Sequence, residues 1–194
     1  MKLKVLMGIT LVLLGIQFLE ASTTKETFVK YPNKYFVESG SWVGGGIENA
    51  LAAGFKHIYS IELKPSLYER CCVQFAPYPF VKLFLGDSAD VLPLILKEID
   101  APATFWLDGH YCGSNSAKGA FNTPLLAELE HISQHPIKTH TILIDDIRQF
   151  GTAEMDFITL EQVIEKIRTI NFNYEITYED GYIPRDVLVA SIKK

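Results

Sequence analysis

From about residue 30 onward, the hydrophobic pattern of the chain alternates between two periods. Short apolar segments rich in β-branched and aromatic residues are typical of buried strands, and the segments between them have helical spacing. Strands are predicted at 35–39, 57–62, 81–86, 104–108 and 141–145, and helices at 47–53, 65–75, 88–99 and 123 to about 135. Strands that alternate with helices indicate a parallel sheet with helices on both faces.

The last forty residues depart from this alternation. A helix is predicted at 157–170, and the strand-like segments 174–178 and 187–192 follow it, joined only by 179–186. So short a joint favours an antiparallel pair. The predicted fold class is therefore α/β: a three-layer, Rossmann-like, seven-stranded sheet, mostly parallel, with a C-terminal antiparallel hairpin. Residues 30–194 contain no repeat or linker pattern and are predicted to form a single domain.

The N-terminal segment 1–21 has a different character. Lys2 and Lys4 precede a nearly uninterrupted apolar run at 5–19, which is typical of a signal peptide or an N-terminal anchor. Fifteen helical residues would span roughly 22 Å, less than the ~30 Å of a bilayer core, so cleavage is favoured over a stable span. The sequence thus predicts export or membrane anchoring, with contact to a membrane only through this segment. A buried helix in a cytoplasmic protein is the alternative.

Charge excludes one class of partner. The formal net charge is −5, and the lysines and arginines are scattered along the chain. A nucleic-acid-binding protein needs a basic surface, so DNA and RNA are not expected as ligands. The sequence does not indicate an oligomeric state.

A glycine-rich loop follows the first predicted strand, and an acid closes the second. Glu38 precedes Gly40, Gly44 and Gly46, and Glu62 stands about twenty residues further on. Glycines let a backbone approach a ligand closely, and an acid at the end of the next strand can accept hydrogen bonds from a ribose. This pattern predicts a nucleotide-like cofactor, although glycine clusters also build plain turns.

A nicotinamide dehydrogenase is one alternative for this pattern. After Gly44 and Gly46, however, the dinucleotide fingerprint needs a third small residue at position 49, where Asn49 stands. The C-terminal antiparallel pair also argues against it.

The residues from about 33 to 192 resemble the class I S-adenosylmethionine-dependent methyltransferases. In that family the sheet ends in such a hairpin, the first loop and the acid after the second strand bind the cofactor, and the loop after the third strand contacts adenine. The glycine loop here is longer than the family's usual one. The resemblance implies S-adenosylmethionine as cofactor, with contacts from Glu38, Gly40, Ser41, Gly44, Gly46, Glu62, Asp87 and Ser88. Asp87 could instead be only a cap for the helix that follows.

A second group of polar residues stands at the predicted ends of strands four and five. Asp108 and His110 follow the fourth strand, and Asp145 and Asp146 follow the fifth. Carboxylates that converge repel one another unless a cation neutralises them, and an oxygen-rich set suits Mg²⁺. The pattern is similar to that of the metal-dependent, macrocin-type sugar O-methyltransferases. This resemblance implies that Asp108, Asp145 and Asp146 are metal ligands; alternatively, the three acids cap loops and accept hydrogen bonds from backbone amides.

His110 is the candidate general base, because an ordinary imidazole can accept a hydroxyl proton near neutral pH. Catalytic roles are thus expected for His110 and Asp108, unless His110 only shapes its loop. The polar stretch 111–122 is a candidate lid or specificity loop over the site. His131 and His135 are read as a solvated helix end.

These observations predict methyl transfer, by O-methylation, to a small hydroxylated acceptor such as a sugar, with a divalent metal. A non-catalytic cofactor-binding protein that retains the fold is the rival prediction, and the export signal favours it because S-adenosylmethionine is made in the cytoplasm. Metal-dependent chemistry without methyl transfer is a third possibility.

Overall fold

The computed structural model describes residues 24–113 and 116–193, and the predicted leader at 1–21 lies outside them. A seven-stranded sheet forms its centre, with strand order β3-β2-β1-β4-β5-β7-β6. The first five strands are parallel, and β7 runs antiparallel to both β5 and β6. The predicted fold class is therefore confirmed. The strands are β1 (Tyr35–Ser39), β2 (Ile58–Glu62), β3 (Val81–Leu85), β4 (Ala103–Leu107), β5 (Thr141–Ile144), β6 (Glu175–Glu179) and β7 (Val187–Ser191).

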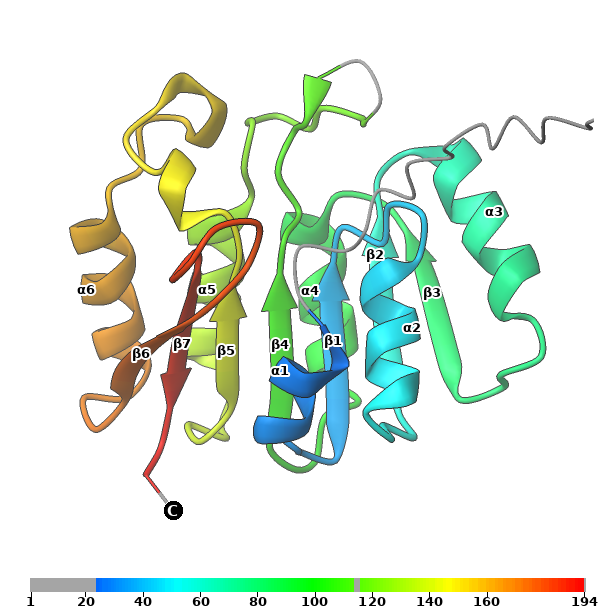
Figure 1. Ribbon diagram of the computed structural model, residues 1–194, viewed down its shortest axis with the longest axis horizontal. Coiled ribbons are helices and arrows are strands. Elements are labelled where there is room, and N and C mark those ends of the chain that lie inside the picture. The colour runs from blue at the N-terminus through cyan, green and yellow to red at the C-terminus, as the bar shows by residue number, and fades with distance from the viewer. Residues whose placement is uncertain (1–23, 114–115, 194) are drawn as a thin grey trace, which may run out of the picture.

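Helices cover both faces of the sheet (Figure 1). One core lies between the sheet and α4, α5 and α6, and a second lies between the opposite face and α1, α2 and α3. None of the helices in the described part of the chain is long and apolar enough to span a membrane. The α-helices are α1 (Lys25–Lys30), α2 (Gly45–Ala52), α3 (Pro65–Phe75), α4 (Ser88–Leu96), α5 (Leu125–Gln134) and α6 (Leu160–Ile170), with 3-10 turns η2 (Ile147–Gln149) and η3 (Ala153–Met155).

Helix α1 was not predicted, yet it belongs to the second core. Its Phe28 is fully buried, with ring centroids 4.8 Å from Phe36 and 5.4 Å from Trp106. At its end, Lys30 and Tyr31 both donate to the carboxylate of Glu179 on β6. Six residues are too few to give a recognisable helical period, so tertiary packing supplies the stability of this helix.

Two strand ends differ from the prediction in a way that matters for the site. Strand β4 ends at Leu107 and β5 at Ile144, which pair in register, so Asp108 and Asp145 are the first residues after neighbouring strands. Side chains that would alternate between faces inside a strand are free here to turn toward the edge of the sheet. In addition, α6 begins at Leu160 rather than at 157, because Thr159 and Gln162 form a capping box.

A pair of buried histidines lies at the opposite edge of the sheet. Nδ1 of His140 accepts from the backbone N–H of Ala103 at 3.0 Å, so its Nε2 carries the proton and faces Nδ1 of His135 at 2.9 Å. Both side chains are buried, so the interpretation of His135 as a solvated helix end was wrong. Burial, together with neighbouring His135 and Lys138, lowers the pKa of His140 to about 3.

His140 should therefore make the protein less stable in acid. Between pH 6.5 and 3 the unfolded chain binds a proton at His140 that the folded chain does not, so the free energy of unfolding falls as pH drops. The loss should be about 2 kcal/mol at pH 5. His140→Asn keeps an acceptor for Ala103 but does not titrate, and urea unfolding at pH 7 and pH 5 should show a smaller loss in this variant. Other titrating groups are common to both proteins and cancel, so equal losses would contradict the prediction.

Candidate functional site

The glycine loop between β1 and α2 packs tightly against the chain itself. Gly40 has a φ of +84°, and a Cβ there would lie 2.5 Å from the carbonyl oxygen of Asp108. A Cβ at Gly46 would lie 1.8 Å from Oε1 of Glu38. Side chains at these positions would overlap protein atoms, so the glycines bring β1, α2 and the end of β4 together. This close packing forms the floor of the site.

Glu38 is buried at the end of β1 within a chain of hydroxyl groups. Ser60 donates to its Oε2 at 2.5 Å, and Ser41 lies 2.5 Å from the Ser60 hydroxyl. Burial raises the pKa of Glu38 to about 8, outweighing the hydrogen bond from Ser60. The residue is thus neutral at pH 7 and links β1, β2 and the glycine loop.

Glu62, at the end of β2, fixes the glycine loop from the other side. Its two carboxylate oxygens accept from the backbone N–H groups of Trp42 and Lys64, each at 2.8 Å. Each oxygen has a second lone pair, and the side chain contributes to the lining of the cleft described below. Glu62 can therefore hold the loop and still accept a hydrogen bond from a ligand.

The loop after β3 combines two roles. Oδ1 of Asp87 accepts from the N–H of Ala89 at 3.0 Å and caps α4, as the alternative interpretation proposed, while the residue also lines the cleft. The hydroxyl of Ser88 donates to Glu128 at 2.6 Å, and Ser88 also lines the cleft. Glu128 was not predicted. It lies on the buried face of α5, and burial raises its pKa to about 7.

A chain of alternating charges lies at the ends of β4 and β5. Nδ1 of His110 is 3.3 Å from Oδ1 of Asp108, and its Nε2 is 3.0 Å from Oδ2 of Asp146. The guanidinium of Arg148 then pairs with both Asp146 and Asp186. Two cationic side chains thus hold these three carboxylates in one connected network.

The three predicted metal ligands are divided between two groups. Asp108, His110 and Asp146 present ligand atoms within 4.8 Å of one another, as do Asp145, Asp146 and Asp186. Among the described residues, no such group joins Asp108, Asp145 and Asp146. Asp146 is common to both groups. Its φ of +57° is left-handed, so the backbone at Asp146 departs from the extended conformation of β5.

Asp186 was missed by the sequence analysis, although its position carried a signal. It is buried and immediately precedes β7, which is antiparallel to β5. Because β7 runs antiparallel to β5, the start of β7 lies beside the end of β5. Acids in the joint before β7 therefore reach the same edge of the sheet as Asp145.

His110 is protonated in this arrangement. Burial alone would lower its pKa, but hydrogen bonds to Asp108 and Asp146 outweigh that effect and raise the pKa to about 12. In the chain without ligands, His110 therefore serves as a cation that separates two acids. The Sγ of Cys112 lies 3.1 Å from Nε2 of the same ring.

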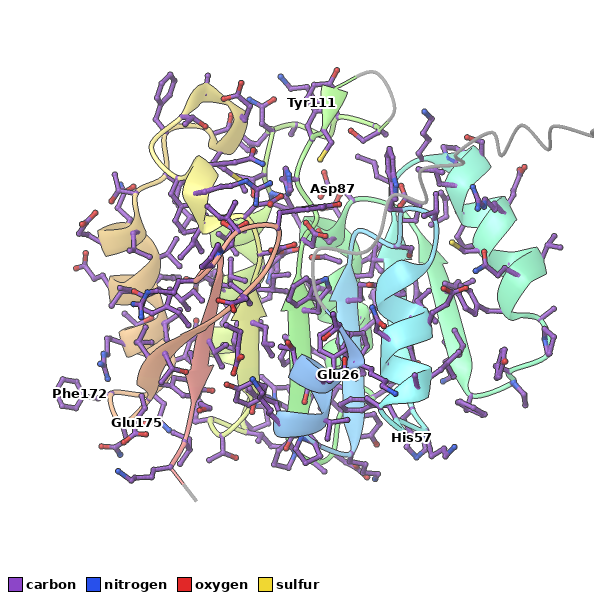
Figure 2. All side chains as sticks on the ribbon, viewed as in Figure 1. Glu26, His57, Asp87, Tyr111, Phe172 and Glu175 are labelled. Atoms are coloured by element: carbon purple, nitrogen blue, oxygen red, sulfur yellow. The ribbon has the colours of Figure 1, made fainter. Side chains whose placement is uncertain are left out.

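The predicted lid 111–122 is tied down at both ends. The backbone N–H of Tyr111 donates to the carbonyl of Asn122 at 2.7 Å, and the carboxylate of Asp156 accepts from the N–H groups of Asn122 and Thr123. Within the loop, a Cβ at Gly119 would meet Oδ2 of Asp87 at 2.2 Å. The loop thus reaches the end of β3, and Figure 2 shows Tyr111 and Asp87 at the same edge of the sheet, where the parallel strands end. Ser114 and Asn115 lie outside the described residues.

One cleft of about 720 Å³ joins these features along the carboxyl edge of the sheet. Its size is within the range of small-molecule sites. Glu38, Gly40, Ser41, Gly46, Glu62, Asp87 and Ser88 line one part, and Asp108, His110, Asp145 and Asp146 line another. Of the predicted site residues, only Gly44 is not in the lining; a Cβ at Gly44 would lie 2.6 Å from the ring of Phe75. Trp42 and Trp106 both contribute to the lining, and Trp106 is also part of the core.

No protein-family model matches the chain, and no curated protein matches it in sequence. Several solved structures are similar in fold. An O-methyltransferase from Bacillus cereus in complex with S-adenosylhomocysteine is 14% identical, with a TM-score of 0.55 over 87% of this chain and 78% of that one. The O-methyltransferase TomG from Streptomyces achromogenes, involved in tomaymycin synthesis and in complex with S-adenosylmethionine, is 14% identical, with a TM-score of 0.53 over 87% of this chain and 78% of that one. The N-methyltransferase NodS from Bradyrhizobium japonicum is 12% identical, with a TM-score of 0.51 over 86% of this chain and 90% of that one. The chain has the class I S-adenosylmethionine-dependent methyltransferase fold.

Proposed function

We propose that the chain binds S-adenosylmethionine and transfers its methyl group to a hydroxyl of a small acceptor, with the help of a divalent cation. One observation carries this proposal: a single cleft adjoins both the glycine loop with Glu62 and Asp87 and the network of Asp108, His110 and Asp146. The cofactor and the acceptor must meet within a few ångströms for in-line transfer, and a continuous cleft permits that.

The cofactor half uses residues that the packing holds rigidly. Glu62 has lone pairs left for a ribose diol, and Oδ2 of Asp87 takes no part in the helix cap and lies beside Gly119 of the loop at 111–122. Because Glu38 is buried and neutral, we assign it to shaping the floor rather than to a charge contact with the cofactor. Ser88 likewise positions α4 through Glu128.

The network fits a divalent cation. Four carboxylates, those of Asp108, Asp145, Asp146 and Asp186, lie close together and are offset by only two cationic side chains, His110 and Arg148. Two negative charges therefore remain, and carboxylate oxygens are the ligands that Mg²⁺ prefers. Asp108 and Asp146 are the proposed ligands on the acceptor side, and Asp145 and Asp186 complete the second group around Asp146. When bound, the cation would stabilise an acceptor oxygen as it loses its proton.

In the reaction, an oxygen lone pair of the acceptor forms a bond to the methyl carbon, and the carbon–sulfur bond breaks to leave a neutral thioether. The hydroxyl proton must leave as well. His110 is the nearest candidate to receive it, but a histidine that already holds two protons cannot act as a base. We assign this role to His110 only in a form whose neighbouring carboxylates are neutralised by another cation.

The protonated state of His110 is also what favours the rival proposal, a cofactor-binding protein without turnover. If His110 remains locked between Asp108 and Asp146 when ligands are present, the site lacks its expected base. The cofactor cleft would be unaffected.

Titration calorimetry tests the proposed function directly. S-adenosylmethionine and S-adenosylhomocysteine are titrated into the protein with and without Mg²⁺. We expect micromolar binding of both, because each ligand can use the loop, Glu62 and Asp87. Failure of both ligands to bind would remove the methyltransferase proposal and its non-catalytic rival together. Binding without methylation of any acceptor would favour the rival.

A further inference from the structure

The lining of the cleft is strongly one-sided in charge. Eight of its residues are aspartate or glutamate, and among the described lining residues there is no lysine or arginine. A ligand with a phosphate or carboxylate would therefore enter a field of like charge, in which the cationic lining residue His110 already lies between two carboxylates. This composition argues against an anionic acceptor.

Cationic side chains around the charged network are already engaged by the chain. His110 lies between Asp108 and Asp146, and Arg148 pairs with Asp146 and Asp186. Lys118 lies 5.9 Å from the ring centroid of Tyr111 at the edge of the cleft. A divalent cation and the sulfonium of the cofactor would offset only part of the remaining negative charge, even with Glu38 neutral.

Aromatic rings also line the cleft, and two of them lie beside the charged network: Tyr111 follows His110 in the chain, and Tyr182 contacts Arg148. Tyr111, Phe121 and Tyr182 all contribute to the lining, and Phe121 and Tyr182 are 70% and 56% exposed. The guanidinium carbon of Arg148 lies 5.4 Å from the ring centroid of Tyr182, so at least two of these rings already contact a cation of the chain. Exposed rings beside carboxylates form a setting in which ammonium groups bind well.

Building on the proposed function, we infer that the acceptor is a small hydroxylated molecule that also carries a protonated amine. Its ammonium group would contact the aromatic rim and the surplus carboxylates, while its hydroxyl receives the methyl group. Nothing in the transfer itself changes: the amine keeps its proton and takes no part in bond making. The same reasoning disfavours acceptors that carry a phosphate or a carboxylate in place of the amine.

Two matched series of probes test the inference without knowledge of the true acceptor. The first is glucosamine, glucose and glucuronate; the second is cyclohexylamine, cyclohexanol and cyclohexanecarboxylate. Each is titrated into the protein loaded with S-adenosylhomocysteine and Mg²⁺, and binding is followed by ligand-observed NMR. In both series we expect the amine to bind at least about fivefold more tightly than the neutral compound, and the acid to bind most weakly.

The outcomes separate the two proposals. If S-adenosylhomocysteine does not bind at all, the proposed function fails and this inference fails with it. If S-adenosylhomocysteine binds but the amines do not bind, or bind no better than the neutral or acidic probes, the inference alone is overturned.

Tyr182→Leu provides a second measurement, because leucine keeps apolar bulk but has no ring face. The advantage of the amine over the neutral probe should fall about threefold to fivefold in this variant. Phe172→Leu is the matched control, since Phe172 is 81% exposed and lies at the far edge of the molecule (Figure 2). An equal change in both variants, or none in Tyr182→Leu, would contradict a role for the rim.

Discussion

Gly46→Ala is expected to lower the free energy of unfolding by about 2–3 kcal/mol and to weaken S-adenosylhomocysteine binding at least tenfold. The added methyl group would lie 1.8 Å from Oε1 of Glu38. Neither partner can yield easily, because Gly46 is in the first turn of α2 and Glu38 is buried on a central strand with Ser60 bonded to it. The strain should pass to the glycine loop and thus to the floor of the cleft. Urea unfolding and calorimetry measure the two effects.

Two further variants test whether this contact is the cause. Gly54→Ala places a methyl group where no atom lies within 4 Å, at a φ of +95°, and should cost only about 1 kcal/mol without affecting ligand binding. Glu38→Asp shortens the side chain that the new methyl group would overlap. The double variant Glu38→Asp/Gly46→Ala should therefore be more stable than Gly46→Ala alone. Additive effects of the two substitutions would show that the overlap with Glu38 is not responsible.

Periodicity was sufficient to predict the fold because each strand is a continuous apolar segment bounded by clear breaks. All seven strands and their directions follow from this pattern, and β1 has the predicted bounds. Helix α1 could not be found this way, because its contribution rests on Phe28 reaching Phe36 and Trp106 across the core. That contact depends on tertiary structure, and the hydrophobic pattern of so short a segment does not predict it.

The sequence predicted where the site lies in the fold, but it did not predict which side chains contact one another there. Strand order alone brings Asp108 and Asp145 to one edge, since β4 and β5 pair in parallel. The partners of these acids depend on side-chain direction. The positive φ of Asp146 lets it face His110 and Arg148, and Asp186 arrives from the hairpin, 38 residues further along the chain than Arg148. The sequence therefore indicated that the acids converge. Their division into two groups around Asp146 depends on side-chain directions that only the three-dimensional structure shows.

Asp146→Asn is expected to weaken Mn²⁺ or Mg²⁺ binding at least about tenfold and to reduce methylation about 100-fold, while cofactor binding stays within threefold. Asp146 is the one carboxylate common to both candidate groups, so its loss removes a charged ligand from each. Asparagine tolerates the left-handed conformation that Asp146 adopts, at a φ of +57°, so the backbone should keep its shape. Calorimetry with Mn²⁺ measures the first effect and transfer of a labelled methyl group measures the second.

Asp156→Asn is the matched control for this prediction. Asp156 also lines the cleft and has a left-handed backbone, with a φ of +48°, but it anchors Asn122 and Thr123 and belongs to neither metal group. Its substitution should loosen the loop at 116–122 and leave metal affinity unchanged. If Asp146→Asn retains both metal affinity and turnover, the carboxylates at the ends of β4 and β5 hold no functional cation, and His110 with Arg148 is then the complete set of counter-charges for the network. In that case the proposed metal assistance would be wrong, while the cofactor cleft would remain as described.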